Sequence, residues 1–255
     1  MPRSEPAVGL RCVLVTGGGT GIGLAVCEAI LEAGGQVVAV GRRPEPLHAL
    51  TARYPGRAHA LVADLAAPEQ REGLLARGKA LMGGLDGFVH SAGYVAHEAP
   101  GRISEAALRA QIEVNLVAPL RLGEQALEQL CDGGGMVFVA STLAVRPVLT
   151  SAVYSAAKAG LIEAMKVLAL AGAPRGIRAS AVLPGVVDTD MIRAAAPNEP
   201  TEAAVQNRID RLRNLHPLGR LGAPADVAAC TAYLLGAHWI TGASMIIDGG
   251  LLLRE

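Results

Sequence analysis

The stretch RCVLVTGGGTGIGLAVCEAILEA, residues 11–33, decides which fold to expect. Residues 11–16 form a short, valine-rich apolar run, which is typical of a strand buried on both faces. Glycines dominate residues 17–23, and the apolar residues of 24–33 then recur at helical spacing. A strand, a glycine turn and a helix in this order predict the first unit of a parallel α/β sheet.

The glycine turn has the composition of a phosphate-binding loop. It places free backbone amides beside the positive end of a helix dipole, an arrangement that suits a pyrophosphate. The spacing Gly17-x3-Gly21-x-Gly23 is a variant of the dinucleotide fingerprint. An ordinary turn is the alternative interpretation of these glycines.

Strands and helices alternate along the remaining chain. Further apolar runs predict strands, and longer periodic segments predict helices. Pro119 is expected to kink the helix 104–130. The expected strands are 36–40, 59–63, 85–90, 136–141, 177–183 and 243–247, and the expected helices 68–82, 104–130, 151–171 and 226–235. The pattern predicts a Rossmann-type doubly wound sheet of about seven parallel strands with helices on both faces, in three α/β/α layers.

We expect one dinucleotide-binding domain over residues 1–255, since α/β domains commonly reach this length undivided. Residues 188–216 are polar and alanine-rich, and Pro197 and Pro200 interrupt them. This composition is expected of a lid over a site, although an ordinary surface excursion is the alternative.

Charge and hydropathy exclude several classes of protein. The chain has 23 basic and 23 acidic residues, so nucleic acid and anionic membranes are not expected partners. No apolar run reaches the roughly 18 residues that span a bilayer. The first residues lack the pattern of a signal peptide, and a cytoplasmic location is expected. Cys12, Cys27, Cys131 and Cys230 have no metal-binding spacing, so we expect buried reduced thiols and no metal site.

Tyr154 and Lys158 are the most conspicuous reactive pair. They lie four residues apart in the expected helix 151–171 and therefore share one face of it. A positive charge fixed beside a phenol lowers its pKa from about 10, so that the group can act as an acid or base near neutrality. A common surface pair is the alternative.

Three further polar residues lie where ligands meet open α/β sheets. Ser141 ends an expected strand, and no nucleophile-elbow motif surrounds it, so we expect its hydroxyl to donate to a carbonyl oxygen. Asn115 lies on an apolar helix face, and burial would require partners for its amide. His90 also ends a strand; we expect a hydrogen-bonded structural residue rather than a catalytic base.

The end of the second strand indicates which dinucleotide binds. A carboxylate at this point accepts from the ribose hydroxyls of NAD, whereas an arginine binds the 2′-phosphate of NADP. The chain has Arg42 and Arg43 there and no acid, which favours NADP; two solvated arginines in a turn are the alternative. Asp64, after the third strand, either caps a turn or contacts adenine.

Taken in order, these motifs resemble those of the short-chain dehydrogenase/reductase family, from about residue 10 to residue 250. The similarity is greatest to 3-oxoacyl-thioester reductases and related alcohol or ketone reductases. The motifs are TGGGTGIG from Thr16, SAG from Ser91, Asn115, Ser141, YSAAK from Tyr154, PGVVDT from Pro184 and the closing TGASMIIDGG.

The resemblance implies a role for each matching residue. Tyr154 would be the general acid, Lys158 would lower its pKa and bind the nicotinamide ribose, Ser141 would hold the substrate oxygen, and Asn115 would position a relay water. NADP(H) would be preferred and NAD(H) possible. The implied cofactor contacts are Thr16, Gly17, Thr20, Gly21, Ile22, Gly23, Arg42, Arg43, Asp64, Leu65, Ser91, Ala92, Gly93, Tyr154, Lys158, Pro184, Gly185, Val187 and Thr189.

Two positions depart from the family's pattern. His90-Ser91-Ala92-Gly93 stands where the family usually has Asn-Asn-Ala-Gly, and Thr20 stands where many NADP-preferring members have a basic residue. The family commonly forms homotetramers, and a homodimer is the alternative; the apolar ending Leu251, Leu252 and Leu253 would suit such an assembly.

These observations favour an NADPH-dependent ketone reductase acting on a small carbonyl or alcohol substrate. The alternatives are an NAD-dependent alcohol dehydrogenase working oxidatively and a dinucleotide-sensing protein without catalysis. The expected substrate pocket is mostly apolar and does not identify one substrate. Its residues are Tyr94, Ser141, Leu143, Val145, Tyr154, Val187 and Ile192, together with the lid.

Overall fold

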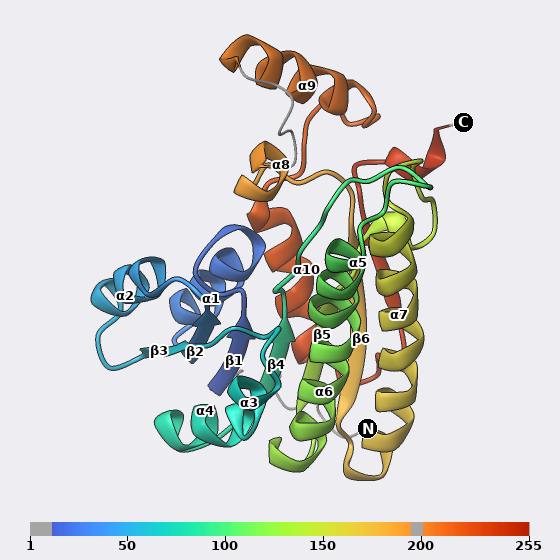
Figure 1. Ribbon diagram of the computed structural model, residues 1–255. Coiled ribbons are helices and arrows are strands. Elements are labelled where there is room, and N and C mark those ends of the chain that lie inside the picture. The colour runs from blue at the N-terminus through green and yellow to red at the C-terminus, as the bar shows by residue number, and fades with distance from the viewer. Residues whose placement is uncertain (1–11, 195–200, 255) are drawn as a thin grey trace, which may run out of the picture.

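A computed structural model describes residues 12–194 and 201–254. Within these residues a parallel sheet of seven strands runs in the order β3-β2-β1-β4-β5-β6-β7. The order reverses between β1 and β4, as in a doubly wound fold, and helices cover both faces (Figure 1). The predicted α/β/α architecture is confirmed.

The strands lie close to their predicted positions. They are β1 Cys12–Thr16, β2 Gln36–Gly41, β3 Ala58–Val62, β4 Gly87–His90, β5 Gly135–Val139, β6 Arg178–Pro184 and β7 Ser244–Ile247. The helices are α1 Gly21–Glu32, α2 Pro44–Arg53, α3 Pro68–Arg71, α4 Leu74–Met82, α5 Glu105–Ile112, α6 Ala118–Gln129, α7 Ala152–Gly172, α8 Asp190–Ala194, α9 Glu202–Asn214 and α10 Pro224–Gly236.

Two apolar cores lie on opposite faces of the sheet. Successive strand residues point to opposite faces, so Leu14 of β1 packs in the core with α4, α6 and α7, whereas Val13 and Val15 pack in the core with α1, α2 and α10. Burial on both faces explains why the strands are continuous apolar runs rather than alternating ones. Arg178 at the start of β6 secures α10, because it donates to the carbonyl oxygens of Leu234 and Leu235.

The predicted helix 68–82 is wrong as one element. It is divided into α3 and α4 by Gly73, whose φ of 61° lies in the left-handed region. Glycine adopts this conformation without the steric penalty of other residues, so the chain changes direction there.

The predicted helix 104–130 is also interrupted. Residues Glu113–Val117 form a π-helical turn between α5 and α6. Pro119 follows that turn; it has no N–H to donate to the carbonyl of Asn115, and its ring crowds that oxygen. The wider turn accommodates this, so the expected kink takes the form of a π-turn containing Asn115.

The expectation of four buried thiols holds for Cys12 and Cys27 only. Cys131 is exposed and Cys230 is partly exposed. Cys131 follows α6 at the amino-end edge of the sheet, where chain connections run over the surface.

Among the described helices, none combines the length and apolar character that crossing a bilayer requires.

Candidate active site

Two cavities of about 710 Å³ and 740 Å³ lie at the carboxyl end of the sheet. Both lie within the roughly 300–1,000 Å³ typical of small-molecule sites. They share five lining residues and therefore adjoin. The shared residues are Ile22, Ser91, Gly93, Thr189 and Met191.

The first cavity is bounded by the glycine loop ahead of α1. Gly17, with φ of 68°, approaches the β4 side so closely that an added Cβ would lie 2.9 Å from the backbone nitrogen of Ala92. A Cβ on Gly23 would lie 2.2 Å from the carbonyl oxygen of Gly17. The loop therefore requires glycines, and it leaves open space beside the amino end of α1, which fits a dinucleotide pyrophosphate.

Thr16 and Gly23 shape this cavity without lining it. Thr16 is fully buried, and its hydroxyl oxygen accepts hydrogen bonds from the backbone nitrogens of Ser91 at 3.2 Å and Ala92 at 3.3 Å. It also shares a 3.0 Å hydrogen bond with Nδ1 of His90. These contacts join the end of β1 to the loop after β4, which forms a wall of the cavity.

The expected adenine end lies in the same cavity. Arg42, Arg43, Asp64 and Leu65 all line it, as do Gly17, Thr20, Gly21 and Ala92. Asp64 also stabilises its own turn, because its Oδ1 accepts from the backbone nitrogen of Ala66 at 3.0 Å. The capping and lining interpretations of Asp64 therefore both hold. The residues present fit a dinucleotide, with two arginines at the end where NADP carries its extra phosphate.

Asn115 is fully buried in the π-turn, and its side-chain amide is hydrogen-bonded to the backbone. Its Nδ2 donates to the carbonyl oxygens of Tyr94 at 2.6 Å and Gln111 at 2.9 Å. Its Oδ1 accepts from the backbone nitrogen of Tyr94 at 3.2 Å. Asn115 thus fixes the loop after β4 to the helix beside Lys158.

Ser141, Tyr154 and Lys158 line the second cavity together. Ser141 lies after β5, and its Oγ accepts from the backbone nitrogen of Leu143 at 3.1 Å. Lys158 is buried, and its Nζ donates to the carbonyl oxygen of Val139 at 2.7 Å and lies 5.7 Å from the centre of the Tyr154 ring. The helix α7 therefore presents both reactive groups to one cavity.

The expected lowering of the tyrosine pKa is wrong for the chain by itself. Burial raises the pKa of Tyr154 to about 12, and a hydrogen bond from Ser141 opposes this only in part. Burial also lowers the pKa of Lys158 to about 7, since a buried ammonium loses its hydration. At neutral pH Tyr154 carries its proton, and Lys158 loses its proton more readily than an exposed lysine does.

His90 is less completely hydrogen-bonded than expected. Its Nδ1 is bonded to Thr16, but its buried Nε2 lacks a partner in hydrogen-bond geometry among the described residues. Burial, and secondarily the charge of Lys158, lower the pKa of His90 to about 3. The ring is neutral at physiological pH, which agrees with a structural role.

The second cavity contains most of the predicted pocket residues. Leu143, Val187 and Ile192 line it, beside Ser141 and Tyr154, and so do the expected cofactor contacts Lys158, Pro184, Gly185 and Thr189. Two of the predicted pocket residues do not line this cavity. Tyr94 lines the first cavity instead, because Asn115 holds its backbone there, and Val145 is 56% exposed and lines neither cavity.

Several lining residues of the second cavity were missed. Val95 and His97 come from the loop after β4, Val148 and Thr150 from the loop before α7, and Leu251 and Leu252 from the C-terminal segment. Three arginines were missed as well: Arg146, Arg208 and Arg254. No local motif marks any of these residues, because only the fold brings their segments together.

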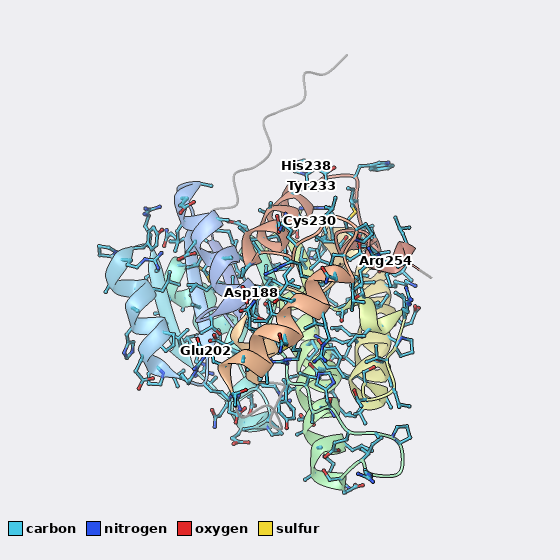
Figure 2. All side chains as sticks on the ribbon, turned by 90° about the horizontal axis from the view of Figure 1, so that it is seen from above. Asp188, Glu202, Cys230, Tyr233, His238 and Arg254 are labelled. Atoms are coloured by element: carbon cyan, nitrogen blue, oxygen red, sulfur yellow. The ribbon has the colours of Figure 1, made fainter. Side chains whose placement is uncertain are left out.

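The expected lid contributes to the same cavity. Residues of α8 and α9 line it, namely Met191, Ile192, Arg208 and Leu212. Figure 2, seen from above, shows α9 crossing over this end of the molecule, from Glu202 towards Arg254. The two prolines of the expected lid, Pro197 and Pro200, lie outside the described residues. That the segment moves stays a prediction.

Comparisons with known proteins agree with this geometry. The family model described as enoyl-(acyl carrier protein) reductase matches residues 17–252. A curated relative, carbonyl reductase family member 4 of Danio rerio, is 31% identical over 95% of this chain and 98% of its own length. The 3-oxoacyl-(acyl-carrier-protein) reductase of Escherichia coli is 28% identical over 95% of this chain and 98% of its own.

A solved structure is similar over nearly the whole chain. The ligand-free aldohexose dehydrogenase of Thermoplasma acidophilum superposes with a TM-score of 0.88 at 27% sequence identity, covering 98% of both chains. The similar proteins thus include both reductases and a dehydrogenase.

Proposed function

The chain belongs to the short-chain dehydrogenase/reductase family, and from that premise we propose that it is an NADPH-dependent reductase. Members of this family are oxidoreductases that act on alcohol and carbonyl groups. The reaction proposed for this chain converts a ketone to a secondary alcohol. A 3-oxoacyl thioester is a candidate substrate, supported by the acyl-carrier-protein reductase among its relatives.

The observation that carries the proposal is the protonated Tyr154 beside Ser141, in the cavity that adjoins the dinucleotide-sized one. Because the pKa of Tyr154 is about 12, the phenol holds its proton at neutrality, and its donation depends on a nearby positive charge that stabilises the phenolate it leaves. Bound NADPH would supply the hydride. Tyr154 donates its proton to the carbonyl oxygen, and the Ser141 hydroxyl donates a hydrogen bond to that same oxygen.

Lys158 serves the tyrosine after proton transfer. A positive ammonium near the new phenolate stabilises it, and a lysine pKa of about 7 allows Lys158 to pass a proton back. We propose that a water positioned by Asn115 links Lys158 to solvent. Asn115 is placed for this because it fixes the loop and the π-turn beside Gly93, where a Cβ would lie 3.9 Å from Nζ of Lys158.

The preference for NADP(H) rests on Arg42 and Arg43, which line the first cavity. A guanidinium pairs with a 2′-phosphate through charge-assisted hydrogen bonds that the ribose hydroxyls of NAD cannot match. We propose Arg42 as the main contact. An NAD-dependent alcohol dehydrogenase is the runner-up, favoured by Thr20 and by the aldohexose dehydrogenase among similar structures.

We further propose one dinucleotide-binding domain, a cytoplasmic location and a homotetramer. Exposed apolar side chains support assembly: Trp239 is fully exposed after α10, and β7 forms the edge of the sheet with Ile246 half-exposed. A second exposed set, Val167 and Leu170, lies on α7. Two separate apolar surfaces are what an assembly with two kinds of interface would need.

The test is cofactor oxidation by the purified protein against a panel of ketones that includes a 3-oxoacyl thioester, with NADPH and NADH. Tyr154→Phe is run alongside, and Tyr233→Phe serves as the matched control because Tyr233 is exposed on α10. We expect NADPH-dependent turnover that falls about 1,000-fold in Tyr154→Phe and persists in the control. Unchanged turnover in Tyr154→Phe would sink the proposal, and bound cofactor without turnover in either direction would favour a sensing role.

A further inference from the structure

The outer wall of the second cavity gathers positive charge. Arg146 comes from the loop before α7, Arg208 from α9 and Arg254 from the C-terminal segment, and His97 lies among them. Among the described residues that line this cavity there is no aspartate or glutamate. Four basic side chains from four separate segments therefore face one space together with Tyr154.

The contacts of Arg146 and Arg254 leave their charges in place. Nη1 of Arg146 donates to the carbonyl oxygen of Leu251 at 3.4 Å and to that of Arg254. Nη1 of Arg254 donates to the carbonyl oxygen of Asn214 at 2.5 Å. These neutral oxygens orient the guanidinium groups without cancelling their charge, and further N–H groups remain on each.

Arginines elsewhere on the surface are paired differently. Arg121 lies 2.9 Å from a carboxylate oxygen of Glu124, and Arg220 lies 2.6 Å from one of Asp226. In both pairs, a carboxylate of a nearby residue neutralises the charge of the guanidinium group. The like charges of Arg146 and Arg254, both held at this cavity, repel each other unless an anion lies between them.

His97 reports the positive field. Burial lowers its pKa first, and the charge of Arg208 lowers it further. Its Nδ1 lies 3.4 Å from the hydroxyl of Thr150, another lining residue. Arg208 on α9 therefore acts electrostatically on His97, which lies in the loop after β4 and lines the same cavity.

We propose that the substrate carries an anionic group, a carboxylate or a phosphate, that Arg146, Arg208 and Arg254 bind while Tyr154 and Ser141 hold the carbonyl. This inference rests on the proposed reductase function and deepens it. A guanidinium matches both anions through paired hydrogen bonds. The apolar lining residues Leu143, Ile192 and Leu252 would contact the carbon chain between the two ends.

The test compares pairs of ketones of which one carries an anionic group and its partner is neutral. The carboxylate pair is 4-oxopentanoate and its methyl ester, and the phosphate pair is dihydroxyacetone phosphate and dihydroxyacetone. We expect kcat/KM for one of the anions to exceed that of its neutral partner at least about tenfold at low ionic strength, with the ratio falling as salt screens the charge. The arm with the larger ratio identifies the anion.

Variants of the three arginines test whether these residues cause the preference for the anionic substrate. Arg146→Gln, Arg208→Gln and Arg254→Gln should each lower the anion-to-neutral ratio about fivefold to tenfold, mainly through KM, and Arg146→Lys should retain part of it. Arg109→Gln is the matched control: Arg109 is exposed, is paired with Glu105 at 2.7 Å and lines neither cavity, so it should leave the ratio as it is. A variant that merely disturbs the structure of the C-terminal segment would lower kcat/KM for both substrates of a pair by the same factor.

The outcomes separate this inference from the proposed function. Turnover of the neutral ketones at rates equal to or above those of the anions would overturn the inference and keep the reductase. Absence of turnover with every substrate and both cofactors would overturn the reductase. In that case calorimetric titration of the cofactor-loaded protein still decides on anion binding: tighter binding of 4-oxopentanoate or the phosphate than of the neutral partner supports it, and equal binding contradicts it.

Discussion

The two cavities at the carboxyl end of the sheet are built in different ways. The first is lined by the glycine loop, the end of β2 and the loops after β3 and β4, and the glycine loop and the loop after β4 approach closely because Gly17 and Gly23 have no side chains. The second is bounded by side chains from the loop after β4, the loop before α7, α9 and the C-terminal segment. The first is suited to a ligand with one fixed shape, and the second to a ligand that can differ between related proteins.

The largest effect should follow from filling the backbone contact in the first cavity. In Gly23→Ala the new Cβ would lie 2.2 Å from the carbonyl oxygen of Gly17, so the loop must shift. We expect the Kd for NADPH to rise about 100-fold or more, since the loop is held by backbone that cannot rotate away. Fluorescence titration of the cofactor measures this.

Gly236→Ala is the control for that change. Gly236 lies at the end of α10 with nothing within 4 Å of its Cβ position. Its cofactor affinity and thermal stability should match the unaltered chain. Equal NADPH binding by Gly23→Ala would show that the glycine loop does not hold the cofactor.

Lys158 lies where the two cavities adjoin, and its titration should be visible in stability. In the folded chain its pKa is about 7, against the ordinary lysine pKa of 10.5. Between these values the unfolded chain holds the proton and the folded chain has lost it, so the free energy of unfolding rises with pH. The contribution from about pH 7 to about pH 9 is on the order of 2 kcal/mol.

Urea denaturation across this pH window, without cofactor, checks the effect. Lys158→Met removes the titrating group and should flatten the slope relative to the unaltered chain. Tyr154 opposes the trend only above its ordinary pKa of 10, because its folded pKa is about 12 and the folded chain then holds the extra proton. An equal pH dependence in Lys158→Met would contradict a buried lysine with a lowered pKa.

A smaller effect is expected from the arginines of the first cavity. Arg42→Ala should raise the Kd for NADPH about tenfold, the equivalent of ~1.4 kcal/mol, and change that for NADH little. Arg43→Ala should have the same sign and a smaller size. If Arg42→Ala weakens both cofactors equally, the guanidinium does not recognise the 2′-phosphate and the NAD-dependent alternative gains.

The smallest effect should distinguish two nearby residues in the segment between β5 and α7. Leu143 lines the cavity, whereas Val145 is 56% exposed outside it. Leu143→Ala should raise KM for the best ketone about threefold to fivefold through lost apolar contact, and Val145→Ala should leave it within error. A larger increase in KM for Val145→Ala than for Leu143→Ala would indicate that the substrate does not bind in the second cavity.

The contrast between the cavities also explains what could be predicted from sequence. Local patterns predicted the positions of the strands, the glycine loop, Arg42 at the end of the second strand and the Tyr154–Lys158 face, because each depends on residues close in the chain. The π-turn at Asn115 and the break at Gly73 were missed, although Pro119 and Gly73 are themselves their local causes. Arg146 and Arg254 were missed because a cavity wall assembled from distant segments leaves no spacing to recognise.

Electrostatics set a second limit. The helical spacing of Tyr154 and Lys158 was predicted correctly, but the direction of the tyrosine pKa was not. Burial outweighs the hydrogen bond from Ser141, and the ammonium of Lys158 is directed at the carbonyl of Val139. How deeply a pair is buried depends on the whole fold, so spacing alone cannot give its protonation state.

Transfer of label tests the central claim most directly. NADPH deuterated at the transferring position of the nicotinamide is mixed with the best ketone, and the alcohol is examined by mass spectrometry. We expect one deuterium on the carbinol carbon, formed about 1,000-fold more slowly by Tyr154→Phe and at the normal rate by Tyr233→Phe. An alcohol without deuterium, or equal rates for Tyr154→Phe and the unaltered chain, would contradict hydride transfer assisted by Tyr154.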